Sequence, residues 1–276
     1  MWWLPNNADQ LYTLLTRTGP DGTQTITVSG ASYTDRQTVI GDTYSYTLTA
    51  VDAAGNVSYA SEPRQATALA PPHLVVPAVT SSVSSTLAFP LTWGAAANPP
   101  HTTYDVQGIS SNPSYSGQAT TATGTKFTSV AGHTYAFQAA TADNYGNGSV
   151  PTPWMYATVP FDQTAGTFSH GWKTVKASGL WLGSEAATTT NRATVTFTVR
   201  SKTMQVIGDK LPSGASFRVY VGGVYKGTVS TRSTVTRHRQ ILWSHAFSTS
   251  ARRTLKLVAV VTSGRTLRID GLAAAP

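Results

Sequence analysis

Short stretches in which apolar and polar residues alternate run along most of the chain. In TYSYTL (residues 43–48) and VTFTV (residues 195–199) the large apolar side chains fall at every second position. Alternation with a period of two over four to eight residues indicates half-buried β-strands. Clusters of Gly, Asn, Asp and Pro separate these stretches, as turns between strands require. The pattern predicts an all-β protein.

One segment of this pattern occurs twice. GDTYSYTLTAVDAAGNVS (residues 41–58) and GHTYAFQAATADNYGNGS (residues 132–149) share Gly, Thr, Tyr, Asp, Gly, Asn and Ser at equivalent positions. Asp and Asn can bond to their own backbone in a turn, and Gly adopts positive φ without steric cost. Each copy is therefore predicted to be a strand that runs into a Gly/Asn turn.

The surroundings of the two copies resemble bacterial fibronectin type III domains. DQLYTLLTRT (residues 9–18) precedes the first copy, whereas FPLTWGA (residues 89–95) and TTYDVQG (residues 102–108) precede the second, which is the more divergent. The resemblance implies immunoglobulin-like sandwiches in which a tryptophan and paired tyrosines fill the core and the later tyrosine forms a corner. The implied core residues are Trp93, Tyr104 and Tyr135 in the second copy, and Trp2 or Trp3, Tyr12 and Tyr44 in the first.

The first of these sandwiches is expected to be incomplete. Trp93 lies well inside its domain, whereas a single residue precedes Trp2. By the resemblance, the first sandwich lacks its first strand and most of its second, which leaves an unpaired edge. We therefore expect that Met1 is not the natural start and that a longer chain lies upstream, carrying the secretory signal that the MWWLPNNADQ start lacks.

The last part of the chain has a different character. From VTFTV onward it holds five or more short strands with Gly-rich turns, including FRVYVGGVYKGTV (residues 217–229), RQILWS (residues 239–244) and RTLKLV (residues 253–258). In order and spacing it resembles the galactose-binding-like jelly-roll domain at the C-terminus of many secreted bacterial proteins. Gly222 stands where that family usually has an aspartate, so the binding chemistry of relatives does not transfer at this position.

Together these observations predict the fold class and the domains. The fold is two tandem immunoglobulin-like (fibronectin type III) β-sandwiches, the first incomplete, plus a C-terminal jelly-roll β-sandwich. The expected domains are residues 1–68, 69–160 and 161–276, with a linker at residues 68–77. Residues 149–163 are expected to be the last strand of the second sandwich running into the second linker. The prolines of the first linker favour an extended spacer.

Charge divides along the same boundary. The chain has a formal net charge of +8, but residues 161–276 carry sixteen basic and four acidic residues, a net charge of +12, and residues 1–160 carry −4. A basic surface of this kind favours anionic partners. Because the basic residues are scattered singly and no recognition helix or aromatic RNA-binding signature is present, we expect no specific nucleic-acid binding.

No motif for catalysis is found. The sequence lacks a nucleophile elbow, a zinc-protease helix motif and a phosphate-binding loop, and its six histidines are isolated. There is no cysteine, so neither disulfides nor thiolate metal sites are expected. Asp143, Asn144 and Asn147 could offer oxygens to calcium, but Asp52 and Asn56 make the same turn in the first copy, which favours a plain turn. We therefore predict no catalytic residue, no metal and no cofactor.

The candidate ligand-binding residues lie in TVTRHRQILWS (residues 234–244). Strict alternation places Arg237, Arg239, Ile241 and Trp243 on one face of a strand, and Leu242 on the other. With Leu242 inward, an indole beside two guanidinium groups suits a sugar ring that bears carboxylate or phosphate. The competing interpretation is that Trp243 and Ile241 are core residues and that the arginines leave through the rim or a bulge.

The leading functional hypothesis is a non-enzymatic, secreted or cell-surface protein that binds polysaccharide or an anionic cell-wall polymer through its C-terminal domain. Two alternatives stay open: an accessory tail of a secreted hydrolase whose catalytic domain lies upstream, and a structural piece of a surface filament or phage tail fibre. No apolar run is long enough for a transmembrane helix. The sequence does not indicate the oligomeric state.

Overall fold

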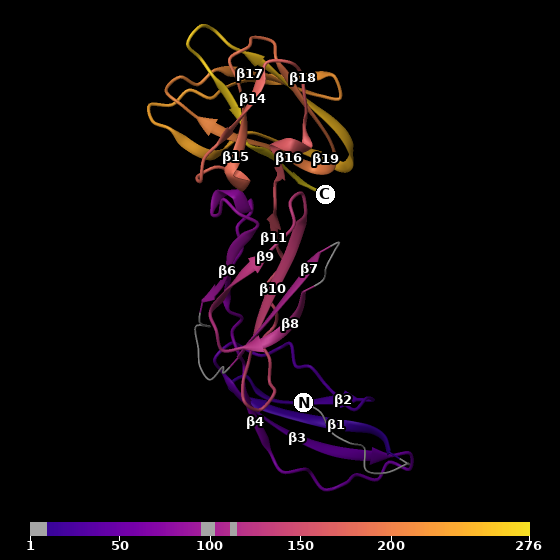
Figure 1. Ribbon diagram of the computed structural model, residues 1–276. Coiled ribbons are helices and arrows are strands. Elements are labelled where there is room, and N and C mark those ends of the chain that lie inside the picture. The colour runs from indigo at the N-terminus through magenta and orange to yellow at the C-terminus, as the bar shows by residue number, and fades with distance from the viewer. Residues whose placement is uncertain (1–9, 95–102, 111–114) are drawn as a thin grey trace.

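The computed structural model describes residues 10–94, 103–110 and 115–276 and is an all-β protein built from antiparallel sheets. Three short 3-10 helices are the helical elements of the described residues: η1 (Thr80–Ser82), η2 (Gln163–Ala165) and η3 (Trp181–Gly183). None of the described helices is long and apolar enough to cross a membrane. The sheets form three groups that follow one another along the chain (Figure 1), and no strand pairing among the described residues joins one group to another.

The first group, the N-terminal sheet, is a single antiparallel layer. Its order is β2-β1-β3-β4, with β1 (Gln10–Gly19), β2 (Gly22–Val28), β3 (Thr43–Asp52) and β4 (Arg64–Thr67). Leu15, Val28, Tyr44 and Tyr46 form its buried cluster, which confirms the inward position expected of Tyr44. Tyr12 pairs with Val51 and is only half-buried. The inward positions of β1 are odd-numbered, so the expected core position of Tyr12 is wrong. Trp2 and Trp3 lie outside the described residues.

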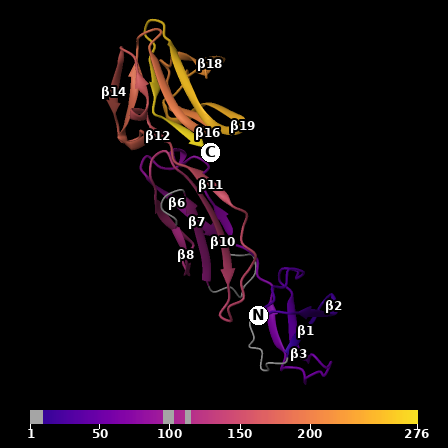
Figure 2. The same ribbon diagram turned by 90° about the vertical axis from the view of Figure 1, so that its right-hand side faces the viewer.

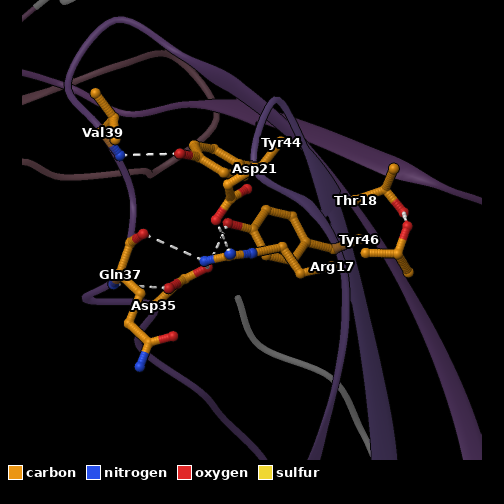
Figure 3. Close-up of polar contacts among 9 residues, drawn as sticks. Arg17, Thr18, Asp21, Asp35, Gln37, Val39, Tyr44 and Tyr46 are labelled. Atoms are coloured by element: carbon orange, nitrogen blue, oxygen red, sulfur yellow. Dashed lines mark hydrogen bonds and ion pairs between the residues drawn. The ribbon is translucent and has the colours of Figure 1, made fainter.

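A buried arginine occupies the inner face of this sheet (Figure 3). The side chain of Arg17 is fully buried, and its guanidinium carbon lies 5.1 Å from the centre of the Tyr44 ring. Arg17 forms ion pairs with Asp21 and Asp35, and the Tyr46 hydroxyl donates a 2.9 Å hydrogen bond to Asp35. Buried charges persist in proteins when they are paired and hydrogen-bonded. Polar contacts therefore take much of the place of an apolar core here.

The second group, the middle sandwich, has two facing sheets. One has the order β5-β6-β9 and the other β11-β10-β7-β8. Their strands are β5 (His73–Val75), β6 (Ala88–Gly94), β7 (Thr103–Ser110), β8 (Tyr115–Thr120), β9 (Gly124–Thr128), β10 (Thr134–Ala142) and β11 (Met155–Thr158). Trp93, Tyr104 and Tyr135 are buried together in its core, as expected. Leu74 and Val76 belong to the same cluster, so the latter part of the expected linker at residues 68–77 is instead core.

The repeated segment has the same local structure in both copies. The backbone N–H of Val39 donates to the Tyr44 hydroxyl at 2.9 Å, and that of Val130 donates to the Tyr135 hydroxyl at 3.0 Å. In the turns, the carboxylates of Asp52 and Asp143 accept hydrogen bonds from the N–H groups two and four residues later and from an Asn side-chain amide. The prediction of a strand that runs into a self-bonded turn is confirmed.

The third group, the C-terminal sandwich, has a large sheet and a small one. The large sheet runs β12-β21-β16-β19-β17-β18, with β13 beside β16, and the small sheet runs β14-β15-β20. Figure 2 shows β14 on the opposite side of the sandwich from β18 and β19. The strands are β12 (Phe161–Asp162), β13 (Thr167–Phe168), β14 (Trp172–Lys176), β15 (Ser184–Thr188), β16 (Thr194–Lys210), β17 (Ser216–Val221), β18 (Val224–Ser230), β19 (Arg237–Val260), β20 (Leu267–Ile269) and β21 (Gly271–Ala275).

The middle and C-terminal sandwiches are packed together. Trp181, from the C-terminal sandwich, is fully buried and belongs to the core cluster of the middle sandwich. Val79 packs with Ile207 and Ala273 across the same junction. The strand expected within residues 149–163 is β11, and β12 begins three residues after β11 ends, so the linker expected after that strand is not a free spacer. The junction fixes the orientation of the C-terminal sandwich.

Candidate binding surface of the C-terminal sandwich

The acidic and basic residues of the C-terminal sandwich differ in burial. Glu185, Asp209 and Asp270 are fully buried and Asp162 is half-buried, so none of its four carboxylates is exposed. Eleven of its sixteen basic side chains are exposed, and none of these eleven has an ion pair among the described residues. Because burial removes the acids from the surface, the positive charge seen by solvent is almost unopposed.

Two irregularities in β19 break the predicted alternation around Trp243. Trp243 lies opposite Val206 of β16 and Ile241 lies opposite Ile207, so Leu242 occupies a bulge between them. A bulge inserts one residue and reverses the faces beyond it. Trp243 and Ile241 therefore lie on opposite faces, and the prediction that Arg237, Arg239, Ile241 and Trp243 share one face is wrong.

Arg239 occupies the second irregularity and contacts the middle sandwich. Its φ is 54°, in the left-handed region that few residues other than Gly and Asn adopt. This turn of the backbone directs the guanidinium to the junction, where Nη1 donates a 2.9 Å hydrogen bond to the carbonyl oxygen of Ser81. Arg237, two residues earlier, is exposed. The structure thus separates the two arginines.

Trp243 packs on the core side of the large sheet. It is half-buried against the core cluster, as is Phe247, and Leu242 is buried in that cluster. The Trp243 ring stacks on His245 with centroids 5.7 Å apart, and His245 meets Phe247 at 4.6 Å. The Arg253 guanidinium covers the Phe247 ring at 4.1 Å. For Trp243, the competing interpretation as a core residue is the one that fits the structure, whereas Ile241 is exposed.

The buried carboxylates form a polar cluster beneath the junction. Asp270 accepts hydrogen bonds from the backbone N–H of Trp181 at 3.0 and 3.2 Å. Arg268 lies 2.7 Å from Glu185 and 3.8 Å from Asp209, and His238 Nδ1 lies 2.7 Å from Asp209. The cluster holds the segment around Trp181 in place from the side of the C-terminal sandwich.

Burial shifts the titration of two of these acids. It raises the pKa of Glu185 to about 8, with a further increase from the nearby Asp209 charge and a partial reduction by Arg268. It also raises the pKa of Asp270 to about 7, against the opposing effect of the Trp181 hydrogen bond. A carboxyl group that loses water favours its neutral form. At neutral pH both acids are therefore more protonated than they would be in an unfolded chain.

The turns considered for calcium are bonded internally. Both carboxylate oxygens of Asp143 accept hydrogen bonds from the turn, and the same holds for Asp52. Within residues 10–94, 103–110 and 115–276, no group of three or more His, Cys, Asp or Glu side chains is arranged to hold a metal ion. The plain-turn interpretation accounts for the repeated sequence.

Several residues with binding potential were missed by the sequence analysis. The register of the large sheet brings Arg200, Arg218, Tyr220, Arg252 and Lys256 to one outer face. The alternation of apolar and polar residues in FRVYV (residues 217–221) could have predicted that Arg218 and Tyr220 share the outer face. The sequence does not show which strands are neighbours, so the gathering of these residues on one face became visible only in the structure.

No protein-family model and no curated protein matches the chain. Similar solved structures include the Agl-KA catalytic domain, with 13% identity and a TM-score of 0.32, covering 43% of this chain and 28% of its own. The CBM36-1 domain of a multidomain xylanase from the hindgut metagenome of Trinervitermes trinervoides has 18% identity and a TM-score of 0.32, covering 42% and 94%. A two-domain fibronectin type III segment of chicken tenascin has 18% identity and a TM-score of 0.24, covering 56% and 88%. At these values the likenesses assign the chain to no family.

Proposed function

We propose that this chain is a non-enzymatic extracellular binding or adhesion protein, or the C-terminal part of one, whose β-sandwich spacers present a basic sandwich to a negatively charged polysaccharide. In this proposal the domains are residues 1–68, 69–160 and 161–276. The first two are fibronectin type III-like and the third is a jelly roll. The observation that carries the proposal is the surface of the C-terminal sandwich, where eleven basic side chains are exposed and no acid is.

The balance of charge on this surface favours an anionic polymer as the ligand. Exposed like charges repel one another, and this surface has no exposed carboxylates that would offset the repulsion. An anionic polymer relieves it over its whole length, because successive sugar units each bring a negative group to the surface. The repulsion therefore favours a polymeric anionic ligand over a small neutral one.

The junction between the sandwiches supports a presenting role. Trp181 and Arg239 tie the C-terminal sandwich to the middle one through a buried ring and a 2.9 Å hydrogen bond. A surface that is held in a fixed orientation loses less conformational freedom on binding than one on a flexible tether. The middle sandwich then acts as a spacer that sets the direction of the binding surface.

Of the predicted contacts, Arg237 fits this role best. It is exposed and belongs to the unopposed positive surface. Trp243 is half-buried, so we propose that it contributes a ring edge at most, while Arg239 is held by the junction. Replacing Arg237 with Gln is expected to weaken binding while leaving the melting temperature unchanged.

Calorimetric titration of the full chain tests the proposal. Polygalacturonate supplies a carboxylate on every sugar, and dextran serves as the neutral control. We expect binding to polygalacturonate that weakens as salt shortens the screening length from ~10 Å at 0.1 M to ~3 Å at 1 M, and none to dextran. Equal binding to both polymers, or binding to neither, contradicts the proposal.

A further inference from the structure

The outer face of the large sheet in the C-terminal sandwich has the composition of a binding site. In β17, Phe217 and Val219 point into the core, whereas Arg218 is exposed and Tyr220 is half-buried on the other side. Because paired residues in neighbouring strands share a face, the register extends this outer face across β16, β19, β17 and β18. We call it the Tyr220 face.

A row of side chains crosses the Tyr220 face at right angles to the strands. Thr196 pairs with Lys256, Lys256 pairs with Tyr220, and Tyr220 pairs with Tyr225. Neighbouring strands are ~4.8 Å apart, so the row places one ammonium group beside two aromatic rings. The two rings lie 5.5 Å apart, inclined at 55°, and Tyr225 is 53% exposed. They form a ledge that is open to solvent.

Positive charges flank this row. Arg218 lies two positions from Tyr220 along β17, and Arg200 of β16 lies directly opposite Arg252 of β19. Like charges directly opposite each other destabilise a sheet. In the described chain, no acidic residue forms an ion pair with Lys256 or with these three arginines. The face thus retains a repulsion that an anionic ligand would relieve.

Hydroxyl groups fill the space between the charges. The Thr198 and Thr254 hydroxyls lie 3.3 Å apart across β16 and β19. The Tyr225 hydroxyl lies 2.9 Å from that of Thr228. Each hydroxyl can both donate and accept hydrogen bonds, and these groups are exposed. Such a set matches the hydroxyls of a sugar ring.

We propose that the Tyr220 face is the binding site for polysaccharides whose sugar rings carry carboxylate or phosphate groups. This inference rests on the proposed function and assigns it to specific residues. The tilted rings of Tyr220 and Tyr225 contact the apolar face of one sugar, while Lys256 and Arg218 pair with its anionic group. Arg200 and Arg252 bind an anionic group further along the same polymer.

The composition of the face favours polysaccharide over nucleic acid. Single-stranded nucleic acids bind where separate aromatic rings each stack one base. Here the two rings are close and inclined to each other, so they form one ledge and not two stacking positions. The threonine hydroxyls suit a ligand that is rich in hydroxyl groups.

Paired charge-neutralising variants of the full chain test the site. Arg218→Gln with Lys256→Gln removes two charges from the Tyr220 face, and Lys173→Gln with Lys176→Gln removes two exposed charges from β14 on the opposite sheet. On polygalacturonate we expect a loss of about tenfold or more in affinity for the first variant, which equals ~1.4 kcal/mol, and less than about threefold for the control. Equal losses overturn the assignment of the site, whereas no binding by the unmodified chain overturns the proposed function instead.

A charge-reversal variant separates binding from folding. Arg252→Glu places an acid opposite Arg200, which is expected to leave the melting temperature unchanged or raise it because it replaces a repulsive pair with an attractive one. Affinity for polygalacturonate, or for a phosphorylated mannan as the phosphate-bearing probe, is expected to fall about tenfold or more. Unchanged affinity for both polymers overturns the site. Tighter binding of single-stranded oligothymidine than of either polymer, lost in the same variant, overturns the ligand class.

Discussion

The guanidinium of Arg239 in the C-terminal sandwich donates a hydrogen bond to the carbonyl oxygen of Ser81 in the middle sandwich, with Nη1 and O 2.9 Å apart. The backbone N–H of Leu182 likewise donates to the carbonyl oxygen of Ser85, at 2.8 Å. These two bonds cross the junction that Trp181 fills. They join the middle and C-terminal sandwiches at this end of the chain.

Removal of the Arg239 side chain is expected to loosen this junction. Arg239→Ala deletes the hydrogen bond and keeps a side chain at the positive φ, so the backbone strain stays comparable. Hydrogen exchange of the Leu182 amide is expected to be faster in this variant, and Arg237→Ala serves as the control because Arg237 is exposed. Unchanged exchange at Leu182 would show that the Arg239 bond does not hold the junction.

Stability is expected to fall as pH rises from about 4 to about 8. Burial raises the pKa of Glu185 to about 8 and that of Asp270 to about 7, so the folded state binds more protons than the unfolded state in this window. Stability then decreases with pH. The stabilisation is fully present near pH 4 and is lost on passing through pH 7 to 8. Thermal unfolding across the range measures this loss.

Glu185→Gln is the control for this pH dependence. The amide cannot ionise, and its oxygen can still accept the Arg268 hydrogen bond that Glu185 accepts at 2.7 Å. The fall in melting temperature between pH 5 and 8 is expected to become shallower than in the unmodified chain, with a residual slope from Asp270. If the melting temperature of the variant fell with pH as steeply as that of the unmodified chain, groups other than Glu185 would cause the pH dependence.

The repeated tyrosine is expected to be a stability element in the middle sandwich. Tyr135→Phe removes the acceptor of the Val130 N–H and is expected to cost about 1 kcal/mol, whereas Tyr135→Ala empties a fully enclosed position and is expected to cost about 3 kcal/mol or more. Denaturant unfolding monitored by the buried Trp93 measures both. If the two variants proved equally stable, the ring would not be packed as the structure shows.

How far the sequence predicted this fold depended on whether the information was local. The strand and turn around Tyr44 and Tyr135 were predictable because alternation and Gly/Asn turns act within a few residues. The hairpin at Gly222 was predictable for the same reason, and both of its glycines have positive φ. Fold class follows from such local signals summed along the chain.

The candidate site depended on information that is not local. The bulge at Leu242 reversed the faces of β19, and a bulge is set by how the strand fits its partner. Arg239 was expected to face ligand, yet a carbonyl from a segment more than 150 residues away holds it. The pairing of Arg200 with Arg252 likewise needs the register of two distant strands. Alternation alone could predict none of these.

Trp243 offers a direct test of the corrected face. Because its ring packs against the core cluster, Trp243→Ala is expected to destabilise the C-terminal sandwich by about 2 kcal/mol, with a lower melting temperature. Ile241→Ala, on the exposed face, is expected to change stability by less than about 1 kcal/mol. If the Trp243→Ala variant had the melting temperature of the unmodified chain, Trp243 would be a surface residue and not part of the core.

The proposed polysaccharide-binding surface lies wholly on the C-terminal sandwich. Backbone amide NMR of the deuterated full chain, titrated with oligogalacturonate at low salt, tests this placement. We expect the shifted signals to fall within residues 161–276 and to concentrate in β16, β17, β18 and the second half of β19. Shifts confined to residues 10–158, or no shifts at saturating ligand, would contradict it.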